Sequence, residues 1–417
     1  MAILNKNYFP KLITYGPNRP NNNIEWFYKT GANRPYFKLF PWDTLPKDYW
    51  YIEILNGDAF IDYPLHTLMP TNILNQIKSK DIGLIICNMQ EPYHSVVEEL
   101  YKDLIIPNNI DPTNIILLSN SSEISREIIA VSEKYNLPVM NSLTIYEWEF
   151  AANQAAYYLG NIDPDQTKIA RNTLSKTVYD KKFLCLNGYN RPHRTAIIAL
   201  LNIYNLIDKG YVSFNTNLRG QQPPNGDEIF KQLITDFTQD SELYNIFSSN
   251  SDIIKKLEPL YLDTKPDESN TLLEFTDSDP KFYVDTYFTV VTETACLYKY
   301  SHPGLTPPGR NLSEKTFKPI LNKHPFIIIG LKHSIKLLQE RGFKTFHPLI
   351  DESYDNEDDD GKRILMAFKQ VIKLANLQPN VLKGYLTYFR AITEYNFNRL
   401  QDVNKQVKYF TSYLSNI

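Results

Sequence analysis

Two lysines follow a helix-starting serine in the segment Asn311-Leu-Ser-Glu-Lys-Thr-Phe-Lys-Pro-Ile320. Ser313 is a good N-cap, so the pattern predicts a helix that begins at Glu314 and carries Lys315 and Lys318 near its first turn. Cations are unfavourable beside the positive end of a helix dipole unless an anion lies between them and the free N–H groups. The spacing therefore indicates an anion site, with a diphosphate as first candidate. A solvated helix start with incidental lysines explains the same residues.

A second cationic segment, Leu186-Asn-Gly-Tyr-Asn-Arg-Pro-His-Arg194, directly follows a predicted strand. It places Arg191 and Arg194 at the start of the next predicted helix, again at the positive end. Open α/β sheets bind ligands at the carboxyl ends of their strands, and the planar guanidinium group suits phosphate oxygens. Because both arginines and both lysines fall in one predicted domain, they indicate a shared phosphate ligand. A surface loop with two arginines is the alternative.

No segment has the spacing of a metal site or of a complete P-loop. Cys87, Cys185 and Cys296 lie far apart, and we expect reduced, buried thiols. The segment 304–311 has the glycines of a P-loop but lacks its Lys-Ser/Thr pair. The acidic segment 351–361 lacks the glutamate that a calcium loop requires, which predicts a solvated loop before a helix. We therefore expect neither a metal nor a resident cofactor.

Residues 181–350 resemble the donor-binding half of fucosyltransferase-like GT-B glycosyltransferases, and in particular glycosyltransferase-like proteins of phages and bacteria. The likeness rests on F-L-C-L-N-G-Y-N-R-P-H-R, on V-T-E-T, and on S-E-K-T-F-K-P-I before an apolar strand. It implies that Arg194 and Lys315 hold the diphosphate of a nucleotide sugar. It also implies that Glu314 binds ribose hydroxyls and that Glu293 lies near the sugar or shapes its pocket. The expected donor-binding residues are Asn187, Arg191, Arg194, Glu314, Lys315 and Lys318.

Sugar transfer also needs a base that takes the proton of the acceptor hydroxyl. In the implied architecture this base comes from a loop after a strand of the first domain. Glu91 fits best, because it follows the predicted strand at 82–88, and Asp58 and Asp62, after the strand at 49–55, are next. A plain loop carboxylate is the alternative at each position. Glu91, Asp58 and Glu293 are the expected catalytic carboxylates.

Short β-rich runs alternate with helical patterns in both halves of the chain. This alternation predicts parallel sheets with helices on their faces, hence an α/β fold with two facing, Rossmann-like domains of the GT-B kind. We expect an acceptor-side domain at 1–165, a nucleotide-sugar-binding domain at 166–385 and a helical tail at 386–417. Strands are expected at 49–55, 82–88, 114–120, 137–142, 181–187, 211–215 and 324–330. Ser122 is the expected N-cap of a helix at 122–136, and 216–275 reads as a polar, weakly helical insertion.

Length and composition agree with a soluble protein of two domains. The chain has 417 residues, of which 42% are hydrophobic and 22% charged. A formal net charge of -3 lacks the basic excess of proteins that grip nucleic acid. The first residues do not read as a signal peptide, and apolar runs are too short to span a bilayer. We therefore expect a cytoplasmic protein, in the host cytoplasm if a virus encodes it, without stable membrane insertion.

The predicted function is metal-independent transfer of a hexose or pentose from a nucleoside-diphosphate sugar to a hydroxyl of a glycan or other acceptor. A second hypothesis keeps this fold but makes a modified base in DNA the acceptor. Its support is a basic, aromatic C-terminal segment comprising Lys383, Tyr388, Arg390, Arg399, Lys405, Lys408 and Tyr409. A third hypothesis is a catalytically silent module that binds a nucleotide or glycan within a larger assembly.

Overall fold

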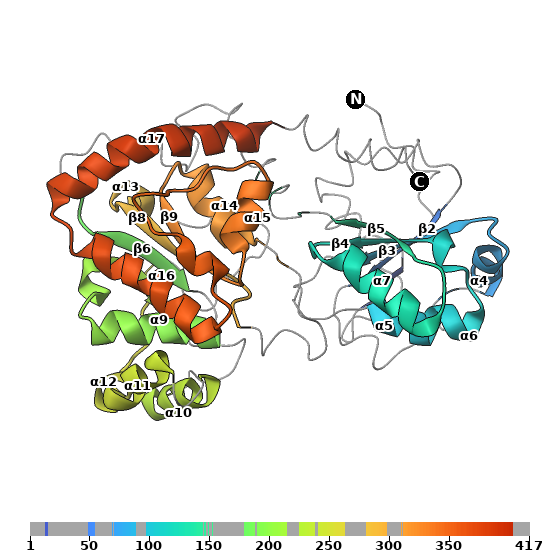
Figure 1. Cartoon of the computed structure of the whole chain (residues 1–417), viewed down its shortest axis with the longest axis horizontal. Helices are drawn as coiled ribbons and strands as arrows, with labels where there is room; N and C mark the ends of the chain where they lie inside the picture. Colours follow the sequence, from blue (N-terminus) through green and yellow to red (C-terminus); the bar gives the residue numbers. More distant parts are fainter. Residues whose placement is uncertain are drawn as a thin grey trace. The chain divides into compact units, whose positions relative to one another are not determined.

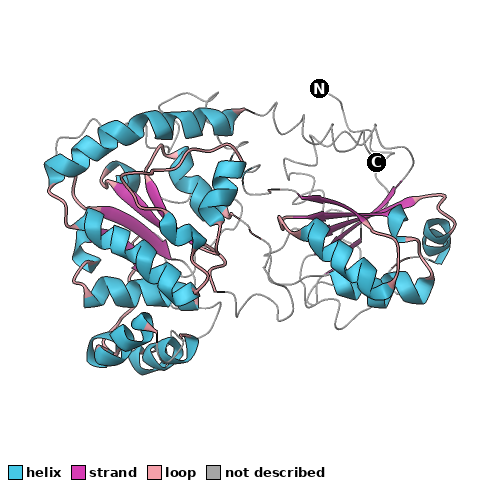
Figure 2. Cartoon of the chain, viewed as in Figure 1, coloured by secondary structure: helices cyan, strands magenta, loops and turns pink. Residues whose placement is uncertain are grey.

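The computed structural model contains two compact units, each built on a parallel sheet (Figures 1 and 2). The first unit comprises Met1–Ala151, Lys299–Asn311 and Asp402–Ile417, and the second comprises Ala152–Tyr298 and Leu312–Gln401. The structure describes residues 13–15, 49–54, 69, 71–88, 97–144, 146, 149, 152, 179–187, 190–214, 225–237, 241–262, 281–297, 310 and 312–402.

This division differs from the predicted boundaries at residues 165 and 385. The first unit ends its longest segment at Ala151, and the chain returns to it at 299–311, which no sequence pattern marks. The expected tail at 386–417 is not a separate body. Helix α17 (Pro379–Gln401) packs against α14 (Glu314–Leu321) and so belongs to the second unit.

The first unit has a five-stranded parallel sheet with the order β1-β2-β3-β4-β5. Its strands are β1 (Ile13–Tyr15), β2 (Tyr49–Ile54), β3 (Gly83–Asn88), β4 (Ile115–Ser119) and β5 (Asn141–Thr144). Strand β4 is an apolar run buried along its whole length, as expected for a central parallel strand. The predicted strands at 49–55, 82–88 and 114–120 are confirmed, whereas the strand expected at 137–142 begins later, at Asn141.

Helices α5, α6 and α7 lie on one face of this sheet (Figure 1). The helical elements are α4 (Thr71–Lys78), α5 (Val97–Glu99), the π-helical turn η3 (Leu100–Ile105), α6 (Ile106–Asn108), the 3-10 turn η4 (Pro112–Asn114) and α7 (Ile124–Tyr135). The N-cap expected at Ser122 is wrong by one residue. Glu123 takes that position without a side-chain cap, and its backbone N–H donates to the Ser121 hydroxyl at 3.2 Å.

The second unit has a four-stranded parallel sheet with the order β7-β6-β8-β9. Its strands are β6 (Phe183–Asn187), β7 (Gly210–Phe214), β8 (Phe288–Thr292) and β9 (Phe326–Ile329). The chain steps from β6 to β7 on one side and then returns to place β8 and β9 on the other. The direction of winding therefore reverses between β6 and β8, which makes the carboxyl ends of these two strands a topological switch point.

Helix α9 (Pro192–Ile203) is buried on nearly all sides, because each residue from His193 to Leu201 is buried. It contacts α16 (Asp360–Ala375) and a group formed by α10 (Gly226–Asp236), α11 (Glu242–Ser249) and α12 (Ser251–Ile254). The region predicted as a polar, weakly helical insertion thus contains three helices that bury apolar side chains. Short helices α13 (Lys281–Val284) and α15 (Ser334–Glu340) and the 3-10 turns η6 (Ile207–Lys209) and η8 (Ser353–Asn356) complete the unit.

Both units thus have the parallel, Rossmann-like α/β architecture that the alternating pattern predicts. Within the described part of the chain, no helix combines the length and apolar character needed to cross a membrane.

His324 is a buried polar element in the core of the second unit. The backbone carbonyl of Thr286 accepts from its Nε2 at 2.9 Å, so Nδ1 is the acceptor for the Thr289 hydroxyl at 2.8 Å. This pairing satisfies only a neutral imidazole. Burial lowers the pKa of His324 to about 4, although the bond to Thr286 opposes this shift.

We expect His324 to make the second unit acid-sensitive. Below pH 6.5 the unfolded chain protonates this histidine, whereas the folded chain does so only near pH 4. The free energy of unfolding should therefore fall by about 3 kcal/mol between these values. His324→Asn should reduce the slope of this part of the pH profile in urea unfolding, whereas substitution of the exposed His347 should not. Equal slopes for His324→Asn and the wild type would contradict the assignment.

Candidate functional site

The carboxyl ends of β6 and β8 are joined by a buried asparagine. The amide oxygen of Asn187 accepts from the Thr292 hydroxyl at 2.5 Å, and its backbone N–H donates to the Ser213 hydroxyl at 3.0 Å. Asn187 is fully buried and so links β6 to both neighbouring strands. Asn187 was predicted to bind the donor, but its side chain instead forms a hydrogen bond within the sheet.

Glu293 directly follows β8 and carries a buried carboxylate, with only 2% of the residue exposed. This carboxylate accepts from the backbone N–H of Thr294 at 3.0 Å and from that of Ser313 at 3.1 Å. The hydroxyls of Ser313 and Thr316 also donate to it. Gly330 makes room for the side chain, because a Cβ atom there would lie 3.3 Å from the Glu293 Cβ and 2.8 Å from the Ser334 hydroxyl.

The predicted N-cap at Ser313 is confirmed, and α14 begins at Glu314 as expected. We expected a bound anion near this helix start, but the protein supplies part of that negative charge itself. The Glu293 carboxylate bonds to the N-cap residue and the first turn, where the helix dipole is positive. The lysines are thus partly explained without any ligand. The sequence signal for this internal anion was the acidic residue immediately after a buried strand.

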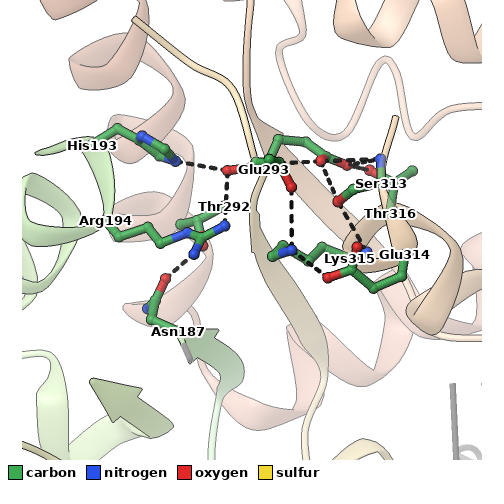
Figure 3. A network of polar contacts seen from close by, with 10 residues as sticks. Asn187, His193, Arg194, Thr292, Glu293, Ser313, Glu314, Lys315 and Thr316 are labelled. Atoms are coloured by element: carbon green, nitrogen blue, oxygen red, sulfur yellow. Dashed lines mark hydrogen bonds and ion pairs between the residues drawn. The ribbon is translucent and has the colours of Figure 1, made fainter. Parts of the chain in front are cut away.

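The backbone carbonyl of Glu293 accepts hydrogen bonds from two side chains in the first turn of α9 (Figure 3). His193 Nε2 donates to it at 2.7 Å and Arg194 Nη2 at 3.3 Å. One residue thus holds the starts of both helices, its carboxylate binding α14 and its carbonyl binding α9. His193 was not among the predicted site residues, and its buried position on an apolar helix gave no signal of this contact.

The pKa of His193 reflects the positive charges around the site. Burial lowers its pKa well below 6.5, and the charges of Arg194, Arg191 and Lys315 lower it further against the bond to Glu293. The imidazole is therefore neutral and donates through Nε2. The residues whose charges act on it come from two segments more than a hundred positions apart. The fold thus concentrates positive charge at the switch point between β6 and β8.

Glu314 and Lys315 form an ion pair on the first turn of α14, with 13% and 23% of their side chains exposed. Lys315 Nζ also donates to the Thr294 hydroxyl at 3.3 Å. Burial raises the pKa of Glu314, but the charges of Lys315 and Lys318 and the hydrogen bond from Lys315 outweigh this effect, and the pKa is lowered overall. Glu314 is therefore ionised at neutral pH.

The predicted donor-binding residues divide into two groups by exposure. Arg191, Glu314, Lys315 and Lys318 are partly exposed, whereas Asn187 and Arg194 are buried. Arg194 is 1% exposed and ties α9 to the end of β8. The partly exposed residues can meet a ligand directly. The buried ones, together with Glu293, set the positions of the helices that carry them.

Two expected catalytic carboxylates, Glu91 and Asp58, lie outside the described residues. Over the part of the chain that the structure describes, no group of His, Cys, Asp and Glu side chains could hold a metal ion. The thiols of Cys185 and Cys296 are buried, and burial raises the pKa of each to about 12.

No protein-family model and no curated protein sequence matches this chain. Among solved structures, the N-terminal domain of trehalose-6-phosphate phosphatase from Candida albicans has a detectable likeness. The match has 9% sequence identity and a TM-score of 0.36, and it covers 95% of this chain and 77% of that one. A TM-score this low carries no argument about fold or function.

Glu293→Gln should destabilise the second unit, because the amide NH₂ would face the backbone N–H of Thr294 or Ser313, which can only donate. We expect a loss of about 2 to 3 kcal/mol in the free energy of unfolding, measured by urea titration with circular dichroism. The matched control is Glu242→Gln, which removes an exposed ion pair with Lys369 and should cost under about 0.5 kcal/mol. A Glu293→Gln protein as stable as the control would show that the carboxylate does not hold α14.

Proposed function

We propose that this protein is a glycosyltransferase of the GT-B kind that binds a nucleoside-diphosphate sugar in its second unit and transfers the sugar to an acceptor hydroxyl. The observation that carries the proposal is that the charges of Arg191 and Lys315 both act on His193, beside the switch point between β6 and β8. Each is a partly exposed cation at the start of a helix. Open α/β sheets bind their ligands at such points, and helix starts bind phosphate.

The leaving diphosphate is the part of the donor that this site suits. Negative charge grows on it as the glycosidic bond breaks, and fixed cations stabilise that charge in the transition state. Arg191, Lys315 and Lys318 would supply this stabilisation without a metal ion. Arg194 would act by holding α9 and by contributing its charge from a buried position.

Glu314 lies beside Lys315 as an ionised carboxylate and would accept hydrogen bonds from the ribose hydroxyls. Glu293 would shape the site through α14. The acceptor base would come from the first unit, with Glu91 or Asp58 as candidates, and the two units would face each other as in GT-B enzymes. The acceptor would be a hydroxyl of a glycan or of another molecule.

Binding of the diphosphate can be tested without knowing the acceptor. Uridine, guanosine, adenosine and cytidine diphosphates are screened by thermal shift against the full chain. At about 100 times its dissociation constant, the matching nucleotide should stabilise the protein by about 2.7 kcal/mol. Lys315→Ala and Arg191→Ala should each weaken affinity by about tenfold or more, because each removes a charge-assisted hydrogen bond to phosphate.

Lys336→Ala is the matched control. Lys336 is an exposed lysine on the first turn of the neighbouring helix α15, where the Asp355 carboxylate already accepts its backbone N–H. Its removal should leave nucleotide affinity unchanged. If no nucleoside diphosphate stabilises the wild type, or if the control loses as much affinity as Lys315→Ala, the proposed site is wrong. Donor hydrolysis by the wild type would further separate an enzyme from a silent binding module.

A further inference from the structure

Arg363 is a buried cation on α16, outside the group of residues that can meet a ligand. Only 2% of the residue is exposed, and its guanidinium pairs with the carboxylate of Asp360 on the same helix. The guanidinium also donates to three backbone carbonyls, those of Glu357 at 3.0 Å, Cys296 at 2.7 Å and Gly330 at 3.1 Å. Burial of a cation is costly unless such bonds satisfy it, so these contacts hold the surrounding backbone in place.

Two of these carbonyls belong to the backbone segments that border Glu293. Cys296 lies just beyond Glu293 in the chain that leaves β8. Gly330 is the first residue after β9, and the carbonyl of its neighbour Ile329 accepts the Glu293 N–H at 2.9 Å. Gly330 also packs against the Glu293 side chain, since a Cβ atom there would lie 3.3 Å from the Glu293 Cβ. One guanidinium therefore holds both segments.

The shape of the guanidinium suits arginine to this place. Its Nε donates to Gly330 and its Nη2 to Cys296, so one rigid, planar group holds two carbonyls at a fixed spacing. A lysine ammonium has the same charge but lacks this rigid pair of donors. Arg363 therefore sets the ends of β8 and β9 relative to each other, in addition to supplying charge.

We propose that Arg363 is a positioning residue for the candidate site and acts through Glu293. It fixes the backbone around Glu293, whose carboxylate bonds to the start of α14 and whose carbonyl accepts from the start of α9. Both helices, α16 and Glu293 belong to the second unit. The effect of Arg363 on ligand affinity rests on the proposed function, whereas its effect on the helix starts does not.

Amide hydrogen exchange of residues 313–317 in the full chain reads the start of α14 directly. Arg363→Lys keeps the charge and removes the rigid pair of donors, so it should speed exchange there by about tenfold. This readout separates positioning from a merely structural role, because α14 packs against β8 and α17, whereas α16 packs against β9, α9 and α11. Loss of α16 packing alone would speed exchange in α16 and α11 but not at 313–317.

Lys362→Ala is the matched control on α16. Lys362 has 63% of its side chain exposed and pairs with Glu357 at 2.6 Å, so its removal should leave exchange at 313–317 unchanged. Leu233→Ala controls for a general loss of stability, because Leu233 is fully buried in α10 and its truncation leaves a cavity far along the chain from the strand ends. An equal increase at 313–317 in Leu233→Ala and Arg363→Lys would overturn the positioning role.

Asp360→Asn provides the test if Arg363→Lys fails to fold. It removes the carboxylate that pairs with the guanidinium but keeps the arginine, so it should speed exchange at 313–317 by about threefold. Unchanged exchange at 313–317 in Asp360→Asn and in a folded Arg363→Lys protein would contradict the proposal.

Nucleoside-diphosphate affinity separates this proposal from the proposed function. If the wild type binds a nucleotide, Arg363→Lys should weaken binding by about fivefold, whereas Lys362→Ala should leave it unchanged. Unchanged affinity together with unchanged exchange would overturn the positioning role and leave the donor site standing. If the wild type binds none, faster exchange at 313–317 still supports the positioning role while the proposed function fails.

Discussion

The candidate site depends on one buried anion. A carboxylate removed from water is costly unless hydrogen-bond donors surround it, and Glu293 obtains its donors from the start of α14. The same residue offers its carbonyl to His193 and Arg194 of α9. The two helices that carry the accessible cations are therefore positioned against a single residue at the end of β8. A substitution that disturbs this residue changes both helices together.

The neighbouring helix uses the same arrangement. The buried carboxylate of Asp355 accepts from the backbone N–H groups of Ile335 and Lys336, both at 2.9 Å, at the start of α15. Arg363 is also buried and donates to the carbonyls of Cys296 at 2.7 Å and Gly330 at 3.1 Å, just beyond β8 and β9. Buried charges therefore satisfy the polar groups that the strand ends and helix starts leave open, and this keeps the edge of the sheet well defined.

Local sequence patterns predicted many helices and strands of the second unit, since apolar runs mark its strands and Ser313 marks the start of α14. The roles of individual side chains were harder to predict, because they depend on contacts far along the chain. Asn187 and Arg194 look like ligand-binding residues in sequence, yet both are buried and bond to the β8 end. The acidic segment at 351–361 reads as solvated, but Asp355 is buried because the adjoining helix start offers it two N–H groups. Local sequence propensities do not predict these hydrogen bonds, because the two partners lie far apart along the chain.

The path of the chain also bears on its synthesis. The first unit is discontinuous, and the partner that Ser122 and Glu123 meet in the structure, Arg310, is made nearly two hundred residues later. On a ribosome, α7 must therefore wait for most of the second unit to emerge before its amino end gains this contact. Domains that close on late segments cannot finish folding in strict N-to-C order. A single cut after Ala151 would likewise leave the first unit without its returning segment. The second unit could be expressed alone only if a linker replaced residues 299–311.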